Sequence, residues 1–437
     1  MLKRITGTLF VLLTAFPLFA QDATTATDIE RRLRELEQRV AAMQAAQPSA
    51  DLVEVKRQIE VLAAEVEALK TRQTETVATA DTQQYGLGAA ASKVYRAGEG
   101  LSFGGYGEFL YQNVEGAGVD RADFLRAILY TGYKFNDRVI FNSEVEYEHA
   151  NTERNGEVEV EFGYLDFMVR PEMNVRAGLV LMPVGLLNEQ HEPTSFLSSR
   201  RNTVESRILP TTWSELGAGV FGDVGPVTYR AYVTTALDSA AFTATGIRGG
   251  RQMGSNAKAN DLAAVARADW HPMEGTLVGG SIYSGNSAQE RNTYEGRVTL
   301  AEAHADAKLR GLQLRALVAR GSVGDAAAIN ARNALTGTAS VGKSFGGWYV
   351  EGGYDILTHF ARRDMSLTPY ARYEKLDTQR SVPTGFLRNR ANNQTITTIG
   401  FAFKPISQTV VKVDYQNVDN EAGTGINQWN VALGYIF

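Results

Sequence analysis

The most regular feature of the chain is an alternation of apolar and polar residues that recurs from residue 101 to the end. In residues 427–437 an extended backbone presents two different faces: one carries Trp429, Val431, Leu433, Tyr435 and Phe437, the other Asn430, Ala432 and Gly434. The pattern repeats without the long apolar helices that would cover such an apolar face. We therefore expect a sheet that closes on itself in lipid, with apolar side chains outward and polar ones inward.

Sixteen runs of this kind are bounded by turn residues. They lie at about 101–115, 122–135, 138–150, 157–170, 174–183, 215–223, 227–236, 261–270, 275–285, 296–309, 312–321, 347–358, 366–376, 394–404, 408–418 and 427–437. A further candidate at 337–345 would give an odd strand number, which single-chain bacterial barrels do not have. Residues 322–346 are therefore assigned to one extracellular loop, with 325–334 as a helical segment.

Short and long connections alternate between these runs. Turns of Gly, Pro, Asn and Asp suit a periplasmic rim, whereas residues 184–214, 237–260, 322–346 and 377–393 suit the opposite rim. The predicted fold is all-β: a 16-stranded antiparallel transmembrane β-barrel, preceded by a short α-helical coiled coil.

The N-terminal part has a different pattern. Residues 1–20 combine Lys3 and Arg4 with a short apolar core, which is typical of a signal peptide. Two heptad runs separated by Pro48 predict a periplasmic coiled coil over 21–72, and residues 73–95 read as a flexible linker to the barrel domain, 96–437. Regular heptads favour assembly of a homo-oligomer; the alternative is an amphipathic helix lying on its own barrel.

Composition narrows the class of protein. The mean hydropathy of −0.21 excludes a bundle of membrane helices, and the absence of Cys excludes disulfides and thiol chemistry. With 44 Lys and Arg against 49 Asp and Glu, the mild acidity argues against nucleic acid as a partner.

Four stretches support a resemblance to a known family: LVLMPVGLL at 179–187, WSELGAGVF at 213–221, YARYE at 370–374 and the terminal YIF. With the heptad-plus-barrel layout, they resemble the phosphate-selective porin O/P family from about residue 95 onward. The coiled-coil arm is similar to the dicarboxylate-channel branch of related trimeric porins, and the final amphipathic strand with its terminal Phe resembles those of bacterial outer-membrane barrels. The resemblance implies a homotrimeric outer-membrane channel; it does not identify the solute.

No enzyme motif is found. The five His residues lack metal-ligand spacing, and the Ser340 to Lys343 match to Ser-x-x-Lys is a pattern that chance supplies easily. We predict no catalytic residues, no metal and no cofactor.

Transport instead needs a charged lumen and a constriction. Strand parity points seven cations inward as pore-lining and solute-binding candidates: Arg126, Arg176, Arg230, Arg267, Arg315, Arg372 and Lys412. Guanidinium groups hold carboxylate or phosphate in a bidentate fork, which favours anions. The alternative is that each cation pairs with a lumen acid such as Glu108, Asp269, Glu374 or Asp414.

The long connection 184–214 is too apolar, at Leu186, Leu187, Phe196 and Leu197, for an ordinary exposed loop. We expect it to enter the barrel and narrow it, carrying Glu189, His191, Glu192, Arg200, Arg201 and Arg207. Two facing strands carry a lumen acidic patch of Glu144, Glu146, Glu148, Glu157, Glu159 and Glu161, whose like charges repel. We predict that Arg200, Arg201 or Arg207 docks onto this patch; the alternative is a solvated vestibule.

Two function classes follow from these patterns. The first is a passive diffusion channel for small hydrophilic, anionic solutes, with outer-membrane lipid and its own copies in a homotrimer as partners. The second is a structural barrel that anchors a periplasmic coiled coil; a non-selective general porin is a variant of the first.

Overall fold

A computed structural model describes residues 84–116, 118–150, 156–289, 293–360 and 365–437 of the chain. They belong to one compact unit, 77–437. The predicted signal peptide, the coiled coil and the first part of the linker lie outside the described residues.

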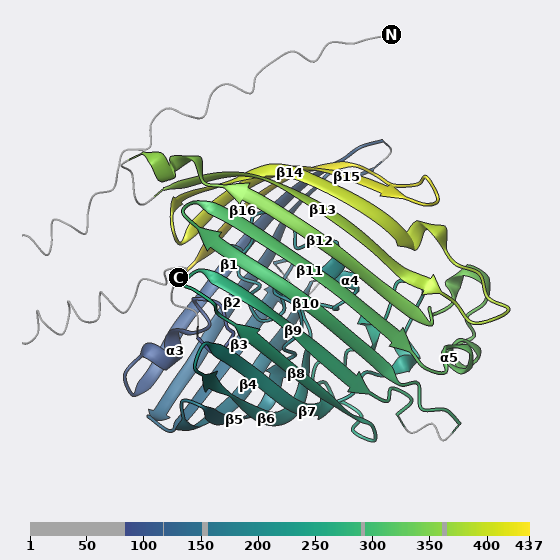
Figure 1. Ribbon diagram of the computed structural model, residues 1–437, viewed down its shortest axis with the longest axis horizontal. Coiled ribbons are helices and arrows are strands. Elements are labelled where there is room, and N and C mark those ends of the chain that lie inside the picture. The colour runs from purple at the N-terminus through teal and green to yellow at the C-terminus, as the bar shows by residue number, and fades with distance from the viewer. Residues whose placement is uncertain (1–83, 117, 151–155, 290–292, 361–364) are drawn as a thin grey trace, which may run out of the picture. The chain divides into compact units, whose positions relative to one another are not determined.

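Sixteen antiparallel strands form a closed barrel in which each strand pairs with its neighbours in the chain and β1 pairs with β16 (Figure 1). This confirms the predicted 16-stranded antiparallel barrel. The strands are β1 Gly100–Val114, β2 Arg121–Asn136, β3 Val139–Glu148, β4 Glu157–Arg170, β5 Met173–Leu181, β6 Ser214–Val224, β7 Val227–Thr235, β8 Leu262–Trp270, β9 Thr276–Gly285, β10 Val298–Leu309, β11 Leu312–Val323, β12 Ser344–Tyr354, β13 Ser366–Ser381, β14 Asn393–Ile406, β15 Thr409–Asn420 and β16 Gln428–Ile436.

The described helices are short. They are α3 Lys93–Arg96, α4 Thr203–Arg207 and α5 Ala326–Arg332, with 3-10 turns η1 Ser239–Ala241, η2 Arg248–Gly250, η3 Gly337–Ala339, η4 Ile356–His359 and η5 Arg390–Asn392. Helix α5 lies within the connection in which the sequence predicted it. In the part of the chain that the structure describes, no helix is long and apolar enough to cross a membrane.

The two faces of the barrel differ as the alternation predicted. In β8, Arg267 and Asp269 are buried inside while Leu262 and Trp270 are exposed outside. Closure pairs the backbone of every strand and leaves no free sheet edge. The outer surface is therefore an apolar band, and the polar groups are confined to the lumen.

The three longest connections lie on one rim, opposite the shortest turns. The turns after β4, β6 and β10 contain two residues each, whereas 182–213, 236–261 and 324–343 are long. In Figure 1 the C-terminus lies at the end of the barrel opposite to α5, which belongs to one of these long connections.

Residues 84–96 depart from the sequence prediction. The sequence predicted a flexible linker over 73–95, but the described part packs inside the barrel, with Leu87 and Ala90 each 1% exposed. Asn142 on β3 donates to the Ala91 carbonyl oxygen at 3.0 Å, and the Tyr95 hydroxyl donates to Asp166 at 2.7 Å. The small Ala side chains, which with Thr and Gln suggested flexibility, instead permit close packing in a confined lumen.

Candidate functional site

The predicted pore-lining arginines of the barrel wall form ion pairs. All seven predicted pore-lining residues point inward, and the six arginines pair with wall or loop acids. Arg126 pairs with Glu108, Glu146 and Glu148 at 2.8–3.3 Å, Arg176 with Asp166 at 2.8 Å, Arg230 with Glu189 and Asp269 at 2.8–3.0 Å, Arg267 with Asp269 and Glu189 at 2.8 and 3.6 Å, Arg315 with Asp306 at 2.8 Å, and Arg372 with Glu351 and Glu374 at 2.9–3.1 Å.

These pairs correspond to the alternative that the sequence left open. Glu108, Asp269 and Glu374 are partners, whereas Asp414 instead accepts from the Ser199 backbone N–H at 2.6 Å. The Lys412 ammonium donates to the Ser198 carbonyl oxygen at 3.0 Å and lies 3.6 Å from the centre of the Phe196 ring. Since an arginine in an ion pair presents little net positive charge to a passing solute, these wall arginines contribute little free positive charge to the lumen.

The connection 182–213 enters the barrel, and its apolar residues Leu186, Leu187, Phe196 and Leu197 are buried. Asn188 joins the two ends of this inserted loop: its amide donates to the carbonyl oxygens of Met182 and Trp213 at 2.6 and 2.8 Å and accepts from the Trp213 N–H at 2.8 Å. These bonds satisfy buried backbone groups and close the loop into a compact unit.

Two carboxylates hold the interior of the inserted loop. Glu205 accepts the N–H groups of Leu186 and Leu187 at 2.8 and 2.7 Å. Glu374 of β13 accepts the N–H groups of Thr203 and Val204, at the start of α4, at 2.7 and 3.1 Å. Helix α4 is thereby attached to the wall formed by β12 and β13.

The predicted docking of loop arginines onto the acidic patch is wrong. Cross-strand pairs Glu146–Glu159 and Glu148–Glu157 do face each other. Among the described residues, however, none of Arg200, Arg201 and Arg207 forms an ion pair with any of the six glutamates. The cation that offsets the repulsion between these glutamates comes from the wall, because Arg126 on β2 pairs with Glu146 and Glu148. From the inserted loop, only the His191 ring approaches Glu144 and Glu161 among the described ion pairs. The arginines lie elsewhere because α4 is attached to β13, away from the patch.

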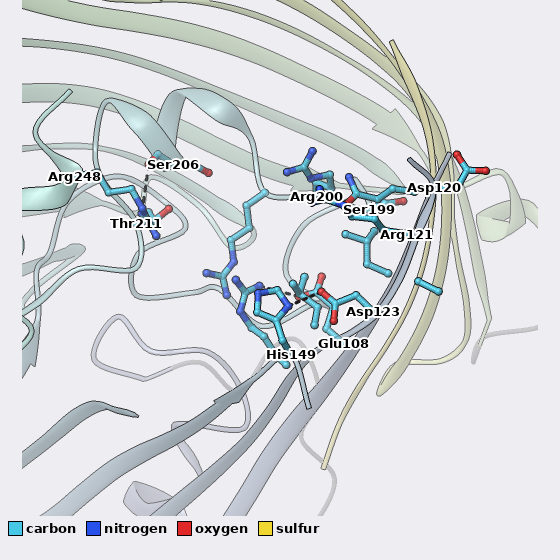
Figure 2. A pocket seen from close by; sticks show the side chains of 16 residues that line it. Glu108, Asp120, Arg121, Asp123, His149, Ser199, Arg200, Ser206, Thr211 and Arg248 are labelled. Atoms are coloured by element: carbon cyan, nitrogen blue, oxygen red, sulfur yellow. Dashed lines mark hydrogen bonds and ion pairs between the residues drawn. The ribbon is translucent and has the colours of Figure 1, made fainter. Parts of the chain in front are cut away.

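The loop arginines line an open vestibule instead. A cavity of about 960 Å³ toward the long-loop rim is lined by Arg121, Arg126, Arg200, Arg201 and Arg248 together with Glu108, Asp120, Asp123, His149, Ser199, Ser206 and Thr211, among others. A smaller cavity of about 260 Å³ shares Arg200, Arg201 and Ser206 and adds Arg207. Figure 2 shows Ser206, Thr211 and Arg248 on one side and Asp120 and Arg121 along the strand wall on the other.

The positive charge of four vestibule arginines is not offset by ion pairs in the described chain. Within the described ranges, Arg200, Arg201, Arg207 and Arg248 have no carboxylate at ion-pair distance; Arg248 donates to the Ser206 carbonyl oxygen at 3.4 Å. Burial lowers the pKa of Arg200 and Arg207. Burial, with neighbouring Arg251 and Arg201, lowers the pKa of Arg248 to about 9, which leaves it charged near neutral pH. A guanidinium whose charged form is disfavoured in this way would be stabilised by a bound anion.

No family model matches the chain. It is 35% identical over 364 residues to a protein of Aquifex aeolicus that carries no characterised function, a match that covers 80% of this chain and 83% of that protein. The chain belongs to the same family as that protein. Two solved structures share the fold: the outer membrane channel DcaP of Acinetobacter baumannii (TM-score 0.51, 14% identity, 77% of this chain, 97% of that one) and a loop-deletion variant of the outer membrane protein OmpT of Vibrio cholerae (0.50, 12%, 77%, 99%).

These likenesses show that the chain has the barrel fold of these outer-membrane proteins. They leave membership of the phosphate-selective O/P family as a prediction, because the shared feature is the 16-strand architecture and the sequence identity is low.

Two residues of the segment 84–96 line a further cavity of this chain. A cavity of about 580 Å³ on the short-turn side is lined by Tyr85, Gly86, Gln190, Arg230, Arg267, Lys308 and Arg310, among others. The carboxylate of Glu192 in the inserted loop accepts the N–H groups of Ala90 and Ala91 at 2.9 and 3.1 Å. The inserted loop and the N-terminal segment are thus joined inside the barrel.

Arg248 was missed by sequence reasoning. It lies in the connection 236–261, which the sequence assigned to the long-loop rim but not to the solute pathway. The basic residues Arg248 and Arg251 were a possible signal. The position of Arg248 near Arg201 depends on how two long connections pack together, and no local sequence pattern predicts that packing.

Proposed function

We propose that this protein is an outer-membrane porin, a passive diffusion channel for small hydrophilic anions such as phosphate or carboxylates. The observation that carries the proposal is the contrast in charge along the lumen. The wall arginines are paired with acids, whereas Arg200, Arg201, Arg207 and Arg248 line open cavities without a carboxylate partner in the described chain.

The vestibule arginines would act on the solute by concentrating and orienting it. Several like charges in a cavity with low-dielectric walls raise the local concentration of counter-ions. Guanidinium groups then replace part of the anion's hydration by bidentate hydrogen bonds. Because the four arginines come from two long connections, the anion can be passed between them rather than held at one tight site.

The test is a reversal potential measured for single channels in a planar bilayer with a salt gradient. Arg200→Gln, Arg201→Gln and Arg207→Gln combined should lower the anion-to-cation permeability ratio by about tenfold, within the range that focused fields produce. Arg388→Gln with Arg390→Gln is the matched control, because these rim arginines pair with Glu421 and Asp377 and line neither cavity. An unchanged ratio in the triple variant would refute anion selectivity by these residues.

A closed structural barrel is the second candidate, and the packing of residues 84–96 in the lumen favours it. The same recording separates the two, since a structural barrel conducts no ions. Channel activity with no ion preference would instead support a general porin.

The assembly that we propose is a homotrimer in the outer membrane, exported by the signal peptide and held partly by the periplasmic coiled coil over 21–72. Light scattering in mild detergent tests this. Strictly monomeric protein, both at full mature length and when the chain begins at residue 86, would exclude it.

A further inference from the structure

Three buried side chains from three elements converge where the inserted loop meets the wall. Glu144 lies on β3, Glu161 on β4 and His191 on the inserted loop, with 0%, 0% and 2% of their side chains exposed. His191 Nε2 lies 3.3 Å from Glu144 Oε1 and 3.5 Å from Glu161 Oε2. All three ligand atoms lie within 4.8 Å of one another.

The cluster has more acceptors than donors. Glu144 Oε2 and both carboxylate oxygens of Glu161 have no hydrogen-bond partner. The nearby Glu146 differs from these two glutamates, because its carboxylate already forms an ion pair with Arg126 at 2.8 Å. Two buried carboxylates side by side and an imidazole leave an unfavourable negative charge unless something positive lies between them.

The imidazole is oriented for a cation. His191 Nδ1 lies 2.9 Å from the Asn188 carbonyl oxygen, which can only accept. Nδ1 therefore carries a proton, which leaves Nε2, facing the two carboxylates, as the ring nitrogen that can ligate a metal ion. A hydrogen bond from the other ring nitrogen to a backbone carbonyl is the usual arrangement around a metal-ligating histidine.

The spacing of the ligand atoms fits a small divalent ion. Zn²⁺ bonds nitrogen and carboxylate oxygen at about 2.0–2.2 Å, so neighbouring ligands of a tetrahedral ion lie roughly 3.3–3.6 Å apart. Both measured separations from His191 Nε2 fall in that interval.

We propose that Glu144, Glu161 and His191 form a binding site for a divalent transition-metal ion of the Zn²⁺ type, with the fourth position open to water. The ion neutralises the two carboxylates and ties the inserted loop to β3 and β4. Its role is structural: it fixes the loop against the wall that carries the acidic patch, opposite the attachment of α4 to β13. This site is independent of the anion pathway, and a non-selective or closed barrel would still hold the ion.

The experiment is a metal content measurement on the full mature chain, refolded in detergent with Zn²⁺ and dialysed against metal-free buffer. We expect one Zn²⁺ per chain, reduced about tenfold or more in Glu161→Gln and in His191→Gln, since loss of outer partners alone has effects of that size. His271→Gln is the control, because His271 lies in the short turn between β8 and β9, where its ring contacts the Thr228 hydroxyl. This substitution should leave the zinc content unchanged.

Two results would overturn the proposal: no bound Zn²⁺ in the refolded wild type, or undiminished Zn²⁺ in both variants. A second measurement needs no variant. Anomalous diffraction at the zinc edge from wild-type crystals should give a peak between Glu144, Glu161 and His191, and a peak elsewhere refutes this site.

Discussion

The barrel wall and the vestibule both carry several arginines, but those of the wall are paired with acids, whereas Arg200, Arg201, Arg207 and Arg248 in the vestibule have no such partner in the described chain. Arg372 on the wall is buried and pairs with Glu351 and Glu374, whereas Arg200 in the vestibule has no carboxylate at ion-pair distance in the described chain. Strands hold side chains at fixed cross-strand positions, so a wall arginine can meet an acid on the neighbouring strand. Loops project cations away from the wall, where the charge remains available to a solute.

The largest effect should come from breaking a wall pair. Arg372→Met leaves Glu351 and Glu374 buried without their cation and should lower the free energy of unfolding by about 3–5 kcal/mol. Arg207→Met in the vestibule removes no ion pair and should change it by at most about 0.5 kcal/mol. Urea unfolding of the refolded barrels measures both values, and equal losses would mean that the two regions do not differ.

A smaller effect is expected at the contact between the N-terminal segment and the inserted loop. A Cβ on Gly88 would overlap the Glu192 carboxylate, so Gly88→Ala should displace residues 84–96 at a cost of about 1–3 kcal/mol. The displaced segment should leave a wider lumen and a higher single-channel conductance.

Gly98→Ala provides the control for that substitution, because nothing lies within 4 Å of a Cβ there. Equal conductance in the two variants would show that the segment does not obstruct the pathway.

The smallest effect tests whether a paired wall arginine contributes to ion selectivity. Arg315→Met combined with Asp306→Leu removes one buried pair without changing the net charge, and such replacements are often neutral for stability. The reversal potential should stay at the wild-type value, in contrast to the vestibule triple variant. A shift toward cations would show that Arg315 contributes net positive charge to the pathway.

The sequence alone predicted the strands, their order and the inward direction of the seven wall cations. These features depend on a period of two, on turn residues and on loop lengths, all of which are local. The burial of Leu186 and Phe196 could likewise be expected from apolar residues in a long connection. Strict parity fails in β4, because a β-bulge beside Glu144 and Val145 turns Phe162 and Tyr164 inward directly after Glu161.

Tertiary structure decided which charges meet. Arg200, Arg201 and Arg207 do not pair with the acidic patch, because the N–H groups at the start of α4 bind Glu374 on β13, more than 160 residues later in the chain. The packing of residues 84–96, the place of Arg248 beside Arg201, and the convergence of Glu144, Glu161 and His191 have the same origin. Each depends on how loops dock inside a closed barrel, and that docking is set by contacts between residues far apart in the sequence, which no local pattern encodes.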